Sequence, residues 1–97
     1  MSILKNSLFA NNITIRPSDV HKIIDMKTSL KINKPRKICI GEHVWIGENC
    51  TLLKGCSIPN CSVLGSCSVL TKSFDISNTL YVGVPAKLVK ENIRWEH

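Results

Sequence analysis

A short polar cluster is the part of this sequence best suited to chemistry. It contains Ser18, Asp19, His21 and Asp25, all within residues 17–37. An imidazole titrates near neutral pH and can accept a proton from a reacting hydroxyl group. A neighbouring carboxylate, Asp19 or Asp25, could orient the ring or hold a substrate. The alternative for His21 is an ordinary exposed loop histidine.

A six-residue repeat on both sides of this cluster predicts the elements that position it. Large aliphatic residues recur at strict intervals of six: Ile40, Ile46, Leu52, Ile58, Leu64 and Leu70. Small residues or Val stand two places before five of them, and glycine follows three of them. A helix has a period of 3.6 and a strand a period of two, so neither explains this spacing. A chain that turns a corner every six residues does, which predicts an all-β fold of stacked coils, a parallel β-helix.

The repeat divides a single domain into four parts. We expect a degenerate coil, a protruding loop, regular coils and a C-terminal cap, over residues 1–16, 17–37, 38–73 and 74–97 respectively. With three strands per coil, the inward residues should stack in pairs: Ile40 on Ile58, Ile46 on Leu64, and Leu52 on Leu70. A long insertion in a regular solenoid is usually a functional loop.

Apolar residues outside the regular coils have two predicted roles. We expect Ile23, Ile24 and Met26 to anchor the loop on a neighbouring surface. The cap should contain a short strand or helix within 88–95, with four buried side chains: Leu88, Val89, Ile93 and Trp95.

Composition limits the remaining possibilities. No apolar run approaches the roughly 20 residues of a membrane span, and no signal peptide is evident, so we expect a cytoplasmic protein. The net charge of +6 suggests anionic partners, but no nucleic-acid-binding motif accompanies it. The five cysteines include no CxxC pair, so we interpret Cys50, Cys56, Cys61 and Cys67 as small apolar fillers rather than redox or metal ligands.

Several segments together resemble a known family. The stretch IGEHVWIGENCTLLKGCSIPNCSVLGSCSVLTK, followed by YVGVPAKLVK, resembles the hexapeptide-repeat O-acetyltransferases that act on galactosides, maltose, xenobiotics or capsular polysaccharides. The segment IRPSDVHKIID resembles the catalytic-histidine loop of that family. The resemblance covers about residues 13–95. It implies a left-handed parallel β-helix, a homotrimer with sites between subunits, and acetyl transfer from acetyl-coenzyme A to a sugar hydroxyl.

The resemblance also implies roles for individual residues. His21 matches the catalytic base, and Asp19, Asn33 and Trp45 match the substrate side of the cleft. The positions that match the coenzyme A groove are Gly47, Glu48, Gly65, Ser66, Thr71, Lys72 and Lys87. Simpler alternatives are a turn asparagine for Asn33, a subunit interface for Trp45 and a solvated surface for each lysine. No metal is expected, because His43 and His97 do not complete a three-histidine zinc site with His21.

The sequence departs from the family at its N-terminal end. Related acetyltransferases carry more N-terminal coils or a helical segment before the histidine loop. The competing interpretation is therefore a non-catalytic trimeric β-helical scaffold, or a truncated and degenerate acetyltransferase.

Overall fold

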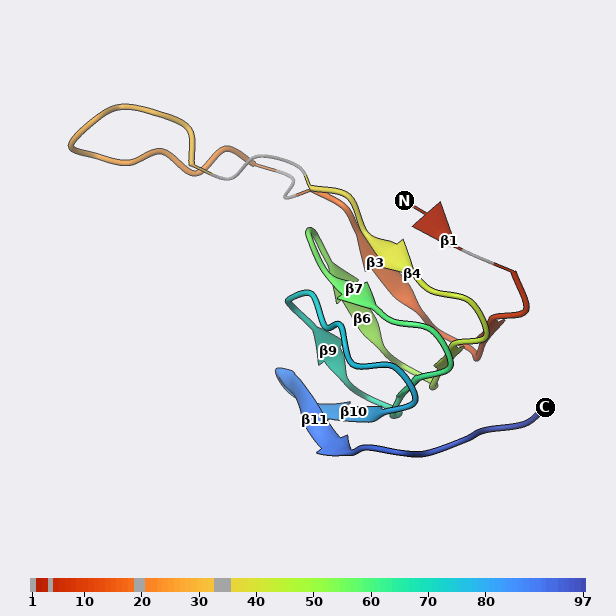
Figure 1. Cartoon of the computed structure of the whole chain (residues 1–97). Coiled ribbons are helices and arrows are strands. Elements are labelled where there is room, and N and C mark those ends of the chain that lie inside the picture. The colour runs from red at the N-terminus through yellow and green to blue at the C-terminus, as the bar shows by residue number, and fades with distance from the viewer. Residues whose placement is uncertain (1, 4, 19–20, 33–35) are drawn as a thin grey trace.

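The structure is a computed structural model that describes residues 2–3, 5–18, 21–32 and 36–97 (Figure 1). Its described part contains eleven short strands in three sheets. No helix in this part of the chain is long and apolar enough to cross a membrane.

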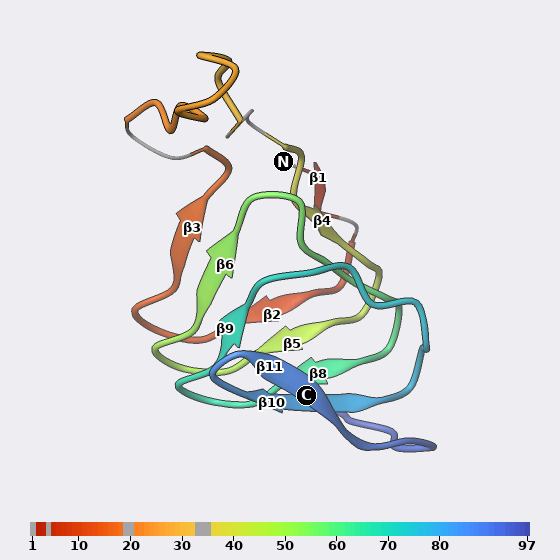
Figure 2. The same ribbon diagram turned by 90° about the vertical axis from the view of Figure 1, so that its left-hand side faces the viewer.

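Each sheet forms one side of a three-sided prism (Figure 2). Sheet 1 consists of β1 (Ser2–Ile3), β4 (Cys39–Ile40) and β7 (Ser57–Ile58). Sheet 2 consists of β2 (Leu8–Phe9), β5 (Trp45–Ile46), β8 (Val63–Leu64), β10 (Leu80–Gly83) and β11 (Ala86–Lys90). Sheet 3 consists of β3 (Thr14–Arg16), β6 (Thr51–Leu53) and β9 (Val69–Leu70). The chain visits the three sheets in turn and so winds a parallel β-helix.

Inward side chains stack from coil to coil. The register pairs Ile40 with Ile58, Ile46 with Leu64, and Leu52 with Leu70, as the six-residue repeat predicts. The N-terminal coil joins the same three columns through Ile3, Phe9 and Ile15. Its members are less buried than those of the next coil, because among the described residues they are packed from one side only. Burial of aliphatic surface between coils is thus the main stabilising term of the fold.

The corners of the coils lie three residues before each inward residue. Positive φ angles recur there, at Asn6, Asn12, His43, Asn49, Gly55, Cys61, Cys67 and Asn78. Asn and Gly adopt this left-handed conformation more readily than other residues. The interpretation of Cys61 and Cys67 as buried fillers is therefore wrong: they are corner residues, half-buried and exposed respectively.

Cys50 and Cys56 occupy the small position two residues before an inward aliphatic. Both are fully buried, as expected for fillers of the core. Burial raises the pKa of both thiols, that of Cys56 to about 11.

The coil geometry continues beyond the end of the six-residue repeat. Ser73 bridges Ser57 in parallel, and β10 pairs with β8 so that Tyr81 stacks on Leu64. The buried Tyr81 hydroxyl donates a hydrogen bond of 2.6 Å to the carbonyl oxygen of Ile76. An aromatic residue after an irregular spacing thus closes the last, partial coil, which the aliphatic pattern does not predict.

The C-terminal end differs in part from the expectation. β11 pairs with β10 in an antiparallel hairpin. The prediction that Leu88 and Val89 are buried is wrong. Both lie on this edge strand, where Leu88 is 39% exposed and Val89 is 57% exposed. Trp95 is buried as predicted, with 7% exposed, and Ile93 is half-buried.

Candidate active site

The histidine loop projects from one edge of the prism (Figure 1). We call the described residues of 17–37 the arm. It leaves the edge where sheet 3 turns into sheet 1, between β3 and β4. The Arg36 amide donates a hydrogen bond of 3.2 Å to the Pro17 carbonyl and closes its base. Further out, Ile24 and Lys31 form an antiparallel bridge.

Asp25 holds the tip of the arm in a turn. Its Oδ1 accepts hydrogen bonds from the amides of Lys27, at 2.7 Å, and Thr28, at 3.2 Å. Its own backbone pairs with Leu30 and Ser29. These hydrogen bonds identify Asp25 as a turn residue.

His21 lies on the arm between the closed base and the paired outer part. The His21 side chain is exposed. The nearby apolar side chains are exposed as well: Ile23 by 52%, Ile24 by 53% and Met26 by 97%. Asp19 and Asn33, the other two predicted residues of this segment, lie outside the described residues.

Trp45 lies on the opposite side of the molecule from the arm. It belongs to β5 and points outward from sheet 2, as predicted, with 40% of its surface exposed. Sheet 2 is the side of the prism that faces away from the edge between sheets 1 and 3. A single chain therefore does not bring His21 and Trp45 together.

Four predicted coenzyme A residues lie along one edge. Gly47 and Glu48 follow β5, and Gly65 and Ser66 follow β8, so the two pairs stack where sheet 2 turns into sheet 3. The amides of Gly47 and Gly65 both donate to the next coil, to Leu64 and Tyr81, at 2.8 Å. The Gly65 carbonyl oxygen accepts a hydrogen bond of 3.0 Å from the Cys50 thiol, and Gly47 is buried. A ligand along this edge would therefore meet the exposed Glu48 and Ser66.

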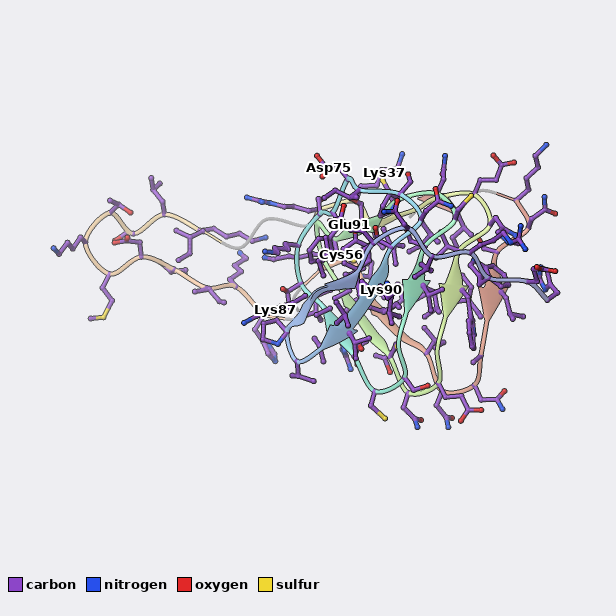
Figure 3. All side chains as sticks on the ribbon, turned by 60° about the horizontal axis from the view of Figure 1, so that its bottom comes forward. Lys37, Cys56, Asp75, Lys87, Lys90 and Glu91 are labelled. Atoms are coloured by element: carbon purple, nitrogen blue, oxygen red, sulfur yellow. The ribbon has the colours of Figure 1, made fainter. Side chains whose placement is uncertain are left out.

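The remaining three predicted residues flank sheet 3. Thr71 and Lys72 follow β9 at the edge from which the arm also departs, and the Lys72 ammonium lies 5.2 Å from the centre of the Phe74 ring. Lys87 follows the tip of the β10–β11 hairpin, whose Gly83 amide donates to the Ser68 hydroxyl at 3.0 Å. Figure 3 shows Lys87 at the outer end of this hairpin, with Lys90 further along it. Both lysines are exposed.

An aromatic cluster that the sequence pattern does not predict lies next to Trp45. The Trp95 indole stacks on the His43 ring at a centroid distance of 4.0 Å and lies 6.0 Å from the Trp45 ring. His97 meets both His43 and Trp95 edge-on. The sequence predicts that Trp95 is buried. Its ring partners His43 and Trp45 lie some 50 residues earlier in the chain, so no local sequence pattern predicts these contacts.

Within the described ranges, no group of three or more His, Cys, Asp and Glu side chains could hold a metal ion.

Comparison with known proteins places this architecture in a class. No family model matches the chain. A polysialic acid O-acetyltransferase of Neisseria meningitidis is 46% identical over 95 residues, which are 98% of this chain and 44% of that protein. The crystal structure of a polysialic acid O-acetyltransferase matches with a TM-score of 0.91 and 45% identity, over 94% of this chain and 43% of the other. A galactoside acetyltransferase in complex with coenzyme A matches with a TM-score of 0.74 and 25% identity, over 95% and 50%.

The homologues of this chain are therefore hexapeptide-repeat acetyltransferases, and the predicted resemblance to that family is confirmed. The predicted fold class, an all-β left-handed parallel β-helix, is confirmed as well. Two of these relatives, at 46% and 40% identity, are named polysialic acid O-acetyltransferases. The chain spans less than half the length of these curated relatives.

Proposed function

We propose that this protein transfers an acetyl group from acetyl-coenzyme A to a hydroxyl group of a saccharide, with His21 as the general base. The observation that carries the proposal is the extent of the similarity. The identity of 46% runs over 95 of the 97 residues and so includes the arm, which the β-helix does not need for its own stacking. Names of the relatives point to a polymer of sialic acid as the first acceptor to test.

The proposed chemistry requires one base and no covalent enzyme intermediate. A ring nitrogen of His21 takes the hydroxyl proton while the hydroxyl oxygen bonds to the thioester carbonyl carbon. The carbon–sulfur bond then breaks, and the departing thiolate receives the proton from the imidazolium. The products are an acetyl ester and coenzyme A. Cysteine nucleophiles are not needed, and burial disfavours the thiolate of Cys50 and Cys56.

We place the site between copies of the chain, in a homotrimer. His21 and Trp45 lie on opposite sides of one chain, so a site that contains both needs an arm from one copy and sheet 2 of another. The arm presents large exposed apolar side chains: Ile23, Ile24, Met26, Leu30 and Ile32. Several large exposed apolar side chains on one projecting segment are typical of a contact with another molecule.

Coenzyme A would lie along sheet 3 and its two edges. The exposed Glu48 and Ser66 border one edge and Thr71 and Lys72 the other. Lys72 and Lys87 would bind the phosphates as point charges. All five cysteines are free, which agrees with the cytoplasm as the place of the reaction.

Calorimetry with acetyl-coenzyme A, combined with a measurement of molecular mass on the same sample, tests the proposal. We expect one ligand per subunit of a trimer, and new acetyl esters on an oligomer of sialic acid by mass spectrometry. A folded trimer that binds no acetyl-coenzyme A would instead support the non-catalytic scaffold. Released coenzyme A should be measured by chromatography, because a thiol reagent would also react with the exposed Cys67.

A further inference from the structure

The C-terminal tail, residues 91–97, is attached along one edge of the prism. It follows β11 and runs back toward the N-terminal coils (Figure 1). The Ile93 amide donates a hydrogen bond of 2.8 Å to the carbonyl oxygen of Asn78, the corner residue of the last coil. Trp95 then reaches His43, the corner residue two coils earlier. The tail therefore spans the row of corners that leads into sheet 2.

Trp95 makes three directional contacts at the His43 corner. Its indole Nε1 donates a hydrogen bond of 2.8 Å to the His43 carbonyl oxygen. The His43 Nε2 lies 3.0 Å from the Trp95 carbonyl oxygen, and since a carbonyl only accepts, this nitrogen carries the hydrogen. The two rings stack with an interplanar angle of 7°. Together these contacts define one orientation of the tail, which apolar burial alone would not.

Trp45 comes two residues after His43 and lies against this contact. Its ring centroid is 6.0 Å from that of Trp95, at an angle of 43°, within the range of attractive aromatic pairs. Trp95 is 7% exposed whereas Trp45 is 40% exposed. One side of Trp45 is thus covered by the tail, and another part of its surface stays open to solvent.

We propose that Trp95 is a positioning residue, which sets the orientation of Trp45 for the saccharide acceptor. It acts in two ways: its hydrogen bonds hold the corner from which β5 starts, and its ring limits the rotamers of Trp45. This inference rests on the proposed function for the role of Trp45, but the orientation of Trp45 itself can be measured without substrate.

A spectroscopic experiment tests the positioning directly. The chain has two tryptophans, so Trp95→Phe and Trp95→Ala each leave Trp45 as the sole tryptophan. Phe keeps a ring against His43 and Trp45, whereas Ala removes it. We expect Trp45 in Trp95→Ala to be quenched by acrylamide at least twofold more efficiently than in Trp95→Phe, with a red-shifted emission. Equal quenching and emission in the two variants would overturn the proposal.

Kinetics separate positioning from a merely structural role. For Trp95→Ala we expect the KM for an oligomer of sialic acid to rise at least fivefold, and the KM for acetyl-coenzyme A to stay within twofold. Ile93→Ala is the matched control, because it removes a half-buried side chain of the tail but keeps Trp95 and the backbone hydrogen bond to Asn78. If Ile93→Ala lowers the melting temperature equally and raises the acceptor KM equally, Trp95 only attaches the tail and the proposal fails.

The two proposals can fail separately. If the wild-type chain transfers no acetyl group, the proposed function fails and the fluorescence comparison alone decides whether Trp95 orients Trp45. His43→Asn gives a further check, because Asn occupies the same corner in two other coils, at Asn6 and Asn78. This variant keeps the corner and loses the stacked ring, so in the Trp95→Phe background it should raise the quenching of Trp45.

Discussion

Gly47 and Ser66 lie so close in successive coils that a Cβ on Gly47 would come within 2.7 Å of the Ser66 backbone nitrogen. The glycine therefore allows two backbones to approach at the edge between sheets 2 and 3. Gly65 occupies the equivalent place one coil later, but its Cβ would meet the Val82 side chain, also at 2.7 Å. The Val82 side chain can rotate away, whereas the Ser66 backbone can move only if the turn after β8 shifts.

This difference predicts unequal effects of the same substitution. We expect Gly47→Ala to lower the free energy of unfolding by about 1–3 kcal/mol, the usual range for overpacking. Gly65→Ala should lower it less, because Val82 can adapt. Urea denaturation of the two variants measures both values. Equal losses would show that the spacing of the coils is more adaptable than the structure indicates.

The proposed base can be tested by removing its imidazole. His21→Ala should lower kcat about 10²–10⁴-fold, since general-base catalysis typically contributes that much. The KM for acetyl-coenzyme A should change little, because His21 contributes a proton transfer rather than donor binding. Lys22→Ala, the next residue on the exposed arm, is the control and should retain activity. An unchanged rate in His21→Ala would rule out the proposed mechanism.

The lysines that flank sheet 3 are expected to act on the phosphates of the donor. Lys72→Gln and Lys87→Gln should each raise the KM for acetyl-coenzyme A by roughly fivefold, the loss of about one charge-assisted hydrogen bond. Neither should alter the KM for acetyl-pantetheine, which lacks the nucleotide and its phosphates. Lys27→Gln, at the tip of the arm, changes the net charge equally and serves as the control. If the substitutions raise the KM for acetyl-coenzyme A and for acetyl-pantetheine equally, these lysines do not bind the phosphates.

Burial of Cys56 predicts a loss of stability in alkali. Burial raises the pKa of its thiol from 9.0 to about 11, so between these values the unfolded chain has lost a proton that the folded chain keeps. The free energy of unfolding must then fall as the pH rises from 9 to 11. We expect the urea midpoint to decline over this interval and to decline less steeply in Cys56→Ala. If the urea midpoints of the wild type and Cys56→Ala fall equally between pH 9 and 11, the raised pKa of Cys56 is not the cause of the lost stability.

The repeat of aliphatic residues determined most of the β-helix in advance. Residues six apart, such as Ile46 and Leu52, fall on successive sides of the coil, and eighteen residues complete one turn, so Ile46 stacks on Leu64. This relation is local and periodic, and the sequence displays it directly. The outward direction of Trp45 follows from the same alternation, because its neighbour Ile46 points inward.

Only the tertiary structure decided how the irregular segments are attached. Tyr81 replaces an aliphatic residue in the last coil after a break in the repeat, and Trp95 finds its partner His43 across 52 positions of the chain. Such contacts depend on the path of the tail, which no local pattern records. The structure likewise assigned Asp25 to a turn and Cys67 to an exposed corner, because hydrogen bonds and backbone conformation are properties of the folded coil. The sequence determined the columns of the core, whereas the fold decided which side chains meet outside them.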